Sequence, residues 1–128
     1  MNLGFIGAGR VGTALAVRLN RKGYPVSAVY DVQEDAARAF ANEISGCTVM
    51  SQPQDVANSA GFVFVSTPDA LIEPVASSIT WETGQTAVHC SGANTVALLD
   101  TAKNAGAFVG VFHPGQTFAD TKQAIENM

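Results

Sequence analysis

Three glycines near the amino terminus have the spacing of a phosphate-binding loop. The segment Gly7-Ala-Gly-Arg-Val-Gly12 directly follows a short apolar run and opens a stretch in which apolar residues recur four positions apart. Gly7 permits a tight turn, Gly9 lets the backbone approach a pyrophosphate without an intervening Cβ, and Gly12 allows close packing of a helix on a sheet. The unpaired N–H groups and the positive dipole end at the start of that helix favour the binding of an anion. The spacing predicts dinucleotide binding, with a purely structural glycine turn as the alternative.

Asp31 lies 24 residues after Gly7, at the end of the second predicted strand. A carboxylate there can accept hydrogen bonds from both hydroxyls of an adenosine ribose. The alternative is a helix cap, because Asp31-Val-Gln-Glu34 has capping-box spacing. An NADP site would place an arginine or lysine just beyond Asp31, and Val32 and Gln33 carry no charge. The sequence therefore favours NAD, with NADP as the alternative.

Polar residues follow three further predicted strands. Ligands bind at the carboxyl ends of parallel strands, so we expect one crevice to hold three groups: Ser66, Thr67 and Pro68; Ser91, Gly92 and Ala93; and His113, Pro114 and Gly115. Ser91 and His113 are the candidate catalytic residues. His113 could donate a proton or hold a substrate carboxylate, or it could only bond a neighbouring loop. His89 lies inside a strand and is predicted to be a core residue with satisfied hydrogen bonds.

The elements that position these residues alternate along the chain. Strands are expected at 3–6, 26–30, 47–50, 62–65, 86–90 and 108–112. Helical spacing lies between them, around 11–19, 36–41, 54–57, 71–79 and 96–102, with Asp69 and Asn94 as N-caps and Gly46 and Gly106 as helix ends. This order predicts an α/β, Rossmann-like, three-layer fold with a mainly parallel six-stranded sheet and right-handed connections.

Length and charge limit the class of protein. A chain of 128 residues, 47% hydrophobic and 14% charged, fits one globular domain. The net charge of −4 argues against binding to nucleic acid or anionic membrane, and no apolar run is long enough to span a bilayer. Four basic residues precede residue 31, and they form either a solvated helix face or an anion-binding region: Arg10, Arg18, Arg21 and Lys22.

The two cysteines, Cys47 and Cys90, form no CxxC pair. Neither a disulfide framework nor a metal site is therefore predicted, and each cysteine is expected to be a small buried residue. The first residues show no basic region and no cleavage site of a signal peptide, so a cytoplasmic location is expected.

Four segments together resemble a known family: 4–12 (GFIGAGRVG), 65–69 (VSTPD), 89–93 (HCSGA) and 111–118 (VFHPGQTF). They resemble the N-terminal Rossmann-like domain of an uncharacterised family of short oxidoreductases, related to 6-phosphogluconate dehydrogenase, pyrroline-5-carboxylate reductase and the deazaflavin-dependent NADP oxidoreductases. The resemblance implies NAD(P) binding. It places Gly7, Ala8, Gly9, Arg10, Val11, Gly12 and Asp31 at the cofactor loop and ribose, and Ser66, Thr67 and Pro68 beside the cofactor.

Members of that family continue into a helical C-terminal domain, which supplies dimerisation and part of the substrate site. The hydroxyacid dehydrogenase relatives use a lysine from that domain, and nothing in residues 1–128 matches it. We therefore expect residues 1–128 to be the NAD(P)-binding domain of a homodimeric oxidoreductase for an unidentified small substrate, inactive alone. The alternatives are a non-catalytic sensing or scaffold domain, and a loop that binds a flavin or an adenosyl compound.

Overall fold

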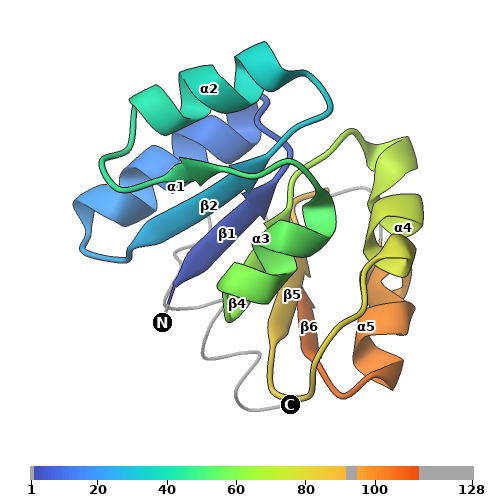
Figure 1. The fold of residues 1–128 in the computed structure, drawn as a ribbon. Helices are drawn as coiled ribbons and strands as arrows, with labels where there is room; N and C mark the ends of the chain where they lie inside the picture. The colour runs from blue at the N-terminus through green and yellow to red at the C-terminus, as the bar shows by residue number, and fades with distance from the viewer. Residues whose placement is uncertain (1, 92–94, 113–128) are drawn as a thin grey trace.

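A computed structural model describes residues 2–91 and 95–112, which form a six-stranded parallel sheet. The strand order is β3-β2-β1-β4-β5-β6 (Figure 1). The bounds are β1 (Leu3–Ile6), β2 (Val26–Tyr30), β3 (Thr48–Val49), β4 (Phe62–Val65), β5 (Thr86–His89) and β6 (Phe108–Val111). The predicted parallel sheet is confirmed; β3, β5 and β6 are shorter than the sequence indicated.

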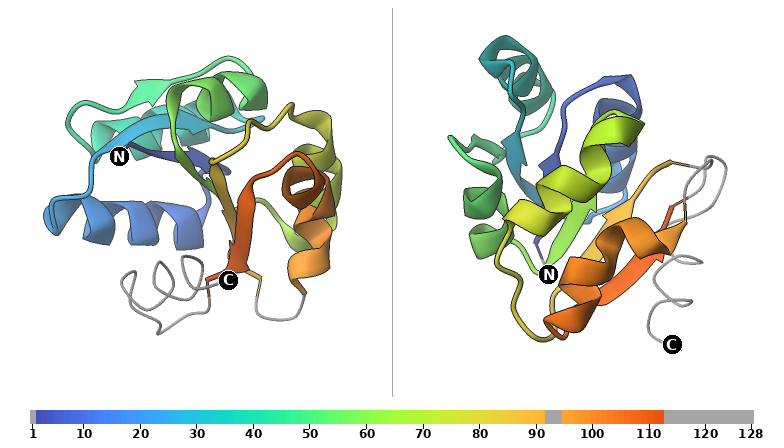
Figure 2. Two further views of the ribbon diagram at one scale, coloured as in Figure 1. Left: turned by 90° about the horizontal axis from the view of Figure 1, so that it is seen from below. Right: turned by 90° about the vertical axis from the view of Figure 1, so that its right-hand side faces the viewer.

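Helices connect the strands on both faces of the sheet. Their bounds are α1 (Arg10–Arg21), α2 (Glu34–Asn42), α3 (Pro53–Ser59), α4 (Asp69–Ser78), the 3-10 helix η1 (Val96–Leu99) and α5 (Asp100–Asn104). The chain moves outward from β1 through β2 to β3, and then from β4 through β5 to β6 in the opposite direction. Right-handed connections therefore place α1 and α2 on one face and the later helices on the other (Figures 1 and 2).

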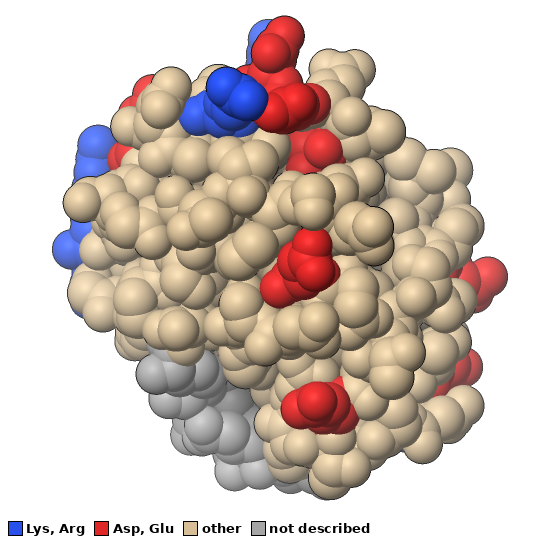
Figure 3. Space-filling view, in the orientation of Figure 1, with Lys and Arg blue, Asp and Glu red and all other residues tan. Residues whose placement is uncertain are grey.

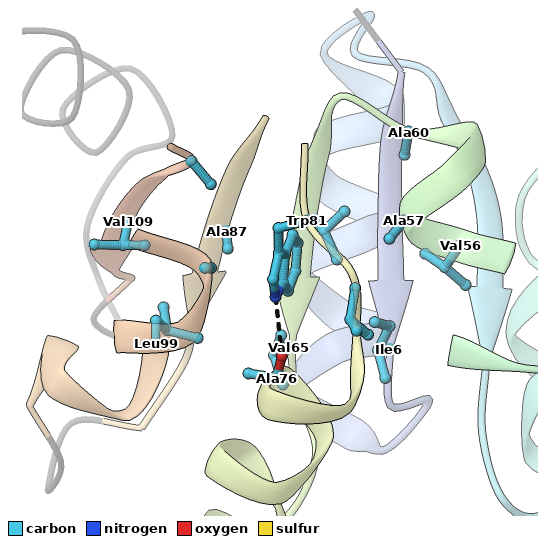
Figure 4. Packing of buried hydrophobic residues seen from close by; sticks show 14 of the residues in the cluster. Ile6, Val56, Ala57, Ala60, Val65, Ala76, Trp81, Ala87, Leu99 and Val109 are labelled. Atoms are coloured by element: carbon cyan, nitrogen blue, oxygen red, sulfur yellow. Dashed lines mark hydrogen bonds between the residues drawn. The ribbon is translucent and has the colours of Figure 1, made fainter. Parts of the chain in front are cut away.

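Two apolar cores hold these layers together. On the α1 and α2 side, Phe5 and Phe64 stack with ring centroids 4.6 Å apart, and Phe40 of α2 packs against Phe5. On the other side, Trp81 lies among aliphatic residues and its Nε1–H donates to the Ala76 carbonyl oxygen (Figure 4). β1 and β4 are buried along their whole length because helices cover both faces, as in other parallel sheets.

Helix boundaries differ from the sequence prediction in several places. Asp31 does not cap α2, whose N-cap is Gln33, and Asp69 is the first residue of α4 rather than its N-cap. Gly46 does not end α2, which stops at Asn42. The predicted cap Asn94 lies outside the described residues; the hydroxyl of Thr95 accepts from the Ala97 N–H and caps η1.

Charge is unevenly distributed over the surface. On the face that Figure 3 shows, basic side chains lie over the part formed by α1 and α2, whereas acidic side chains are scattered more widely. Arg10, Arg18, Arg21 and Lys22 are all exposed. Arg18 and Arg21 lie in the last turn of α1, where positive charge complements the helix dipole. Within the described part of the chain, no helix has the length and apolar character needed to span a bilayer.

Candidate functional site

A cleft of about 760 Å³ lies at the carboxyl ends of the strands, where the strand order reverses between β1 and β4. The loops after β1, β2, β4 and β5 all contribute to it. Most of the predicted site residues line the cleft: Gly7, Ala8, Gly9, Val11, Asp31, Ser66, Thr67, Pro68 and Ser91. Arg10 and Gly12 adjoin it in the sequence without lining it. The predicted residues Gly92, Ala93, His113, Pro114 and Gly115 lie outside the described residues.

The three glycines of the loop have different surroundings. Gly7 has a φ of +110°, and a Cβ there would lie 2.6 Å from the Ser66 backbone. A Cβ on Gly12 would lie 2.6 Å from Ser66 Oγ and 2.9 Å from the Gly7 carbonyl oxygen. A Cβ on Gly9 would have no neighbouring atom within 4 Å. The fold therefore requires glycine at positions 7 and 12, whereas nothing in the described protein requires it at position 9.

Ser66 fixes the shape of the glycine loop from the end of β4. Its hydroxyl donates to the Gly7 carbonyl oxygen at 2.8 Å, and its backbone N–H donates to the Ile6 carbonyl oxygen at 2.8 Å. The side chain predicted to bind a cofactor is thus already bonded to the loop.

Asp31 ties the same loop to the end of β2. Its Oδ2 accepts from the Ala8 N–H and its Oδ1 from the Gln33 N–H, both at 2.8 Å. These bonds explain why Asp31 does not cap α2. Each carboxylate oxygen has more than one lone pair, so Asp31 can accept further hydrogen bonds from a ligand in the cleft.

The first turn of α1 begins at the open Gly9. Gly9 is the N-cap, and no side chain caps the helix. The first N–H groups of a helix have no partner within the helix. Together with the helix dipole they favour a negatively charged ligand at this end of the cleft.

Exposed apolar side chains line the same cleft. Val11, Val32 and Leu71 are 59%, 81% and 45% exposed. In the described part of the chain, the other exposed large hydrophobic residues are Val96 and Phe108. A cluster of exposed apolar residues inside a concave site is typical of a ligand-binding surface. Sequence reasoning did not select Val32 or Leu71; the available signal was an apolar residue directly after Asp31 and another in the turn after Pro68.

The loops that follow β4 and β5 contribute polar side chains to the cleft. Thr67 Oγ1 is buried and has no hydrogen-bond partner within the described structure, so it is a candidate contact for a ligand. Ser91 is buried at the cleft wall. Burial raises the pKa of the neighbouring Cys90 thiol to about 12, so Cys90 is not an activated nucleophile.

His89, predicted to be a core residue, is confirmed as one. It is fully buried and both ring nitrogens have backbone partners. Across residues 2–91 and 95–112, no three His, Cys, Asp or Glu side chains come together in a way that could hold a metal ion.

Part of this chain is similar in sequence to a known enzyme. A curated relative, the mitochondrial 3-hydroxyisobutyrate dehydrogenase of Bos taurus, is 38% identical over 69 residues. That match covers 54% of this chain and 20% of the relative. The chain thus matches only a fifth of the curated relative's length.

Solved structures with the same fold are also longer than this chain. A protein from Bacteroides fragilis described as an NADP oxidoreductase superposes with a TM-score of 0.73 at 27% identity, over 92% of this chain and 45% of the other. An imine reductase from Aspergillus terreus, in complex with NADPH4 and dibenz[c,e]azepine, gives 0.74 at 17% identity, over 91% and 42%.

The family comparison covers most of the chain. The model of the Rossmann-like domain family matches residues 1–114, which include the glycine loop, Asp31 and all six strands. This match and the solved structures confirm the resemblance that the four sequence segments carry, and they confirm the fold predicted from the order of strands and helices. The chain therefore belongs to the Rossmann-like domain family.

Proposed function

We propose that this chain is the dinucleotide-binding domain of an NAD(P)-dependent oxidoreductase. The observation that carries the proposal is the contrast among the loop glycines. Gly7 and Gly12 are required by close contacts within the protein, but Gly9 faces open space at the uncapped start of α1. A purely structural turn needs no glycine there. Close approach of a pyrophosphate to the backbone does need one.

The residues of the cleft fit such a cofactor along its length. The N–H groups at the start of α1 would hold the pyrophosphate, and Asp31 would accept hydrogen bonds from the adenosine ribose. Val32 and Leu71 would contact the adenine, while Thr67 and Ser91, which also line the cleft, would lie towards the nicotinamide end. When bound, the cofactor supplies hydride transfer; the protein supplies position and electrostatics.

The charges near Asp31 favour NAD over NADP. A hollow of about 340 Å³ shares Tyr30, Asp31 and Val32 with the cleft, and Glu34 is among its lining residues. The nearby Arg38 is bonded to Glu34, with Nε 3.1 Å from Oε1. The Glu34–Arg38 pair carries no net charge, so a ribose 2′-phosphate beside Asp31 would meet the negative charge of the Asp31 carboxylate without a compensating cation among these residues. This preference differs from the cofactors named for the Bacteroides fragilis and Aspergillus terreus proteins.

The activity of the whole protein is a further part of the proposal. The relatives are longer than this chain, so we propose that a helical domain beyond it completes the substrate site and forms a homodimer. Ser91 and His113 are the proposed contacts to the nicotinamide carboxamide or the reacting carbonyl. A cytoplasmic location stays a prediction from the sequence.

Calorimetric titration with four ligands tests this function. We expect saturable binding of NADH, weaker binding of NADPH, and none of FAD or S-adenosylmethionine. Preferred binding of FAD or S-adenosylmethionine would refute the dinucleotide assignment. NADH oxidation by the full-length protein with a panel of keto acids and imines then separates an enzyme from a sensing domain, which would bind NADH without turnover.

A further inference from the structure

The imidazole of His89 is buried, and His89 directly precedes a residue that lines the cleft. His89 ends β5, between Val65 of β4 and Val111 of β6, and none of its surface is exposed. It does not line the cleft, but the next two residues, Cys90 and Ser91, do. A buried polar ring in this position needs hydrogen-bond partners.

Both partners are backbone groups, and together they fix the protonation of the ring. The Ser91 N–H donates to Nδ1 at 3.1 Å, and Nε2 lies 2.8 Å from the Thr95 carbonyl oxygen. A backbone N–H can only donate and a carbonyl can only accept, so Nδ1 must carry the lone pair and Nε2 the proton. Among the three forms of the ring, only the neutral Nε2–H form makes both bonds.

The two bonds attach His89 to the cleft wall on one side and to the helical layer on the other. Ser91 and Thr95 flank residues 92–94, which lie outside the described part. Thr95 caps η1, with its hydroxyl accepting from the Ala97 N–H at 3.3 Å, and Leu99 at the end of η1 is fully buried. The ring therefore fixes the backbone of a cleft residue relative to a rigid core element.

We propose that His89 is a positioning residue for Ser91. The hydrogen bond from the Ser91 N–H to Nδ1 sets the backbone at residue 91, and hence the place where the Ser91 side chain meets the nicotinamide end of the cleft. The functional part of this proposal rests on the proposed function; the positioning part does not. His89 is not a catalytic residue, because it does not reach the cleft.

Two substitutions separate the two hydrogen bonds. In His89→Asn, Oδ1 lies as many bonds from the backbone as Nδ1 and can still accept from the Ser91 N–H. In His89→Gln, the side-chain amide can still donate to Thr95, but no acceptor faces Ser91. Each variant loses one buried hydrogen bond, so a role in stability alone would affect both similarly.

The first measurements use the cofactor-free, full-length protein. We expect the ¹⁵N NMR spectrum of wild-type His89 to show a bare Nδ1 and a protonated Nε2. The Ser91 amide should exchange slowly in the wild type and in His89→Asn, and faster in His89→Gln. Trp81→Phe is the matched control, because it removes a different buried hydrogen bond, from Trp81 Nε1 to the Ala76 carbonyl oxygen, in a core cluster that does not include Ser91 (Figure 4). It should leave the Ser91 amide unchanged.

The functional measurement uses the keto acid or imine that the wild type reduces fastest. We expect His89→Gln to lower kcat by about 10- to 100-fold, approaching the effect of Ser91→Ala. His89→Asn should stay near the wild-type value, and NADH affinity should change little in either variant.

A protonated Nδ1 in the wild type would overturn the proposal, and so would equal losses in the Asn and Gln variants. The NMR result needs no variant, so it decides the matter even if His89→Gln does not fold. A wild type that binds no NADH would refute the proposed function, whereas the NMR and exchange results would still decide the role of His89.

Discussion

The carboxylate of Asp31 accepts a hydrogen bond from the backbone N–H of Ala8 at 2.8 Å. This bond joins the end of β2 to the glycine loop, 23 residues earlier in the chain. The group proposed to bind the ribose thus also orients the loop proposed to bind the pyrophosphate. This hydrogen bond connects the two halves of the proposed adenosine diphosphate site, so we expect a change at Asp31 to affect both.

Asp31→Ala should weaken NADH binding by roughly 10- to 150-fold, because hydrogen bonds to a charged group contribute about 1.5–3 kcal/mol. NADPH binding should change less, since the same substitution removes a charge that repels the 2′-phosphate. The wild type should bind NADH more tightly than NADPH. Calorimetric titration of both cofactors measures all four affinities.

Asp35→Ala is the control for this experiment. Asp35 lies in the first turn of α2, is exposed and does not line the cleft. Its replacement by alanine therefore changes the net charge by the same amount as Asp31→Ala but removes no residue of the cleft. Tighter wild-type binding of NADPH would contradict the prediction. It would leave Asp31 with only its bonds to the N–H groups of Ala8 and Gln33, and Arg10 as the better candidate for the 2′-phosphate.

Gly9→Val should abolish dinucleotide binding while the protein stays folded. A Cβ at position 9 has no neighbour within 4 Å, so the new side chain has open space at its base, and it would enter the space proposed for the pyrophosphate. The loss of stability should be small, about 1 kcal/mol or less, the cost of replacing glycine at an N-cap. Circular dichroism checks the fold and titration with NADH checks binding. Wild-type affinity in this variant would remove the loop from the proposed site.

Gly12→Ala should behave in the opposite way. Its Cβ would crowd Ser66 Oγ, which holds the Gly7 carbonyl, so the hydroxyl would have to leave its partner. We expect a loss of about 1–3 kcal/mol in the free energy of unfolding, as for other overpacked sites. Gly61→Ala is the control, because a Cβ at Gly61 would have no neighbouring atom within 4 Å. Its free energy of unfolding should stay within about 0.5 kcal/mol of the wild-type value. A urea midpoint for Gly12→Ala equal to that control would show that the contact relaxes freely.

The strands and helices could be predicted because they depend on local pattern. The buried runs 3–6 and 62–65 are wholly apolar or glycine, and α1 repeats apolar residues at helical spacing. The role of Asp31 in capping could not be predicted, because its carboxylate could bond to nearby backbone N–H groups or to a distant one. The distant partner, the Ala8 N–H, becomes a neighbour only when β1 and β2 pair.

Most of the residues predicted for the site line the cleft, but Val32 and Leu71, which also line it, were not selected from the sequence. The loop glycines and Asp31 have the spacing typical of a dinucleotide-binding loop. Val32 and Leu71 carry no such spacing, and a single apolar residue on a surface is common. They become informative only when the fold brings both into one cleft.

Ser91→Ala and His113→Ala should each lower the turnover of the full-length protein by about 10²-fold or more, the usual size of a general acid or base contribution. NADH affinity should change little, because most of the proposed cofactor contacts come from other residues. Steady-state rates and calorimetry on the same preparations separate the two effects. The 128-residue chain alone should bind NADH without turnover. Unchanged rates in both variants, or enzyme-like turnover by the isolated chain, would contradict this assignment.

The two cysteines should react slowly and in a fixed order. Burial raises the pKa of Cys47 to about 11 and that of Cys90 to about 12, against an ordinary value of 9.0. Since the thiolate is the reactive form, iodoacetamide at pH 8 should alkylate both more slowly than an ordinary thiol, and Cys90 more slowly than Cys47. NADH should slow Cys90 further because Cys90 lines the cleft, and should not affect Cys47, which does not. Mass spectrometry of each cysteine peptide measures the rates.

The same raised pKa values predict how stability changes with pH. Unfolding returns both thiols to the ordinary value, so their contribution to stability is fully present below about pH 9. It is lost as the pH rises above 9 and is gone once the pH has passed the folded values of about 11 and 12. The urea midpoint should therefore fall with rising pH in that window, and fall less steeply in Cys90→Ala measured against its own value at pH 8. An identical slope in the two proteins would mean that Cys90 is more accessible to water than its place in the cleft wall indicates.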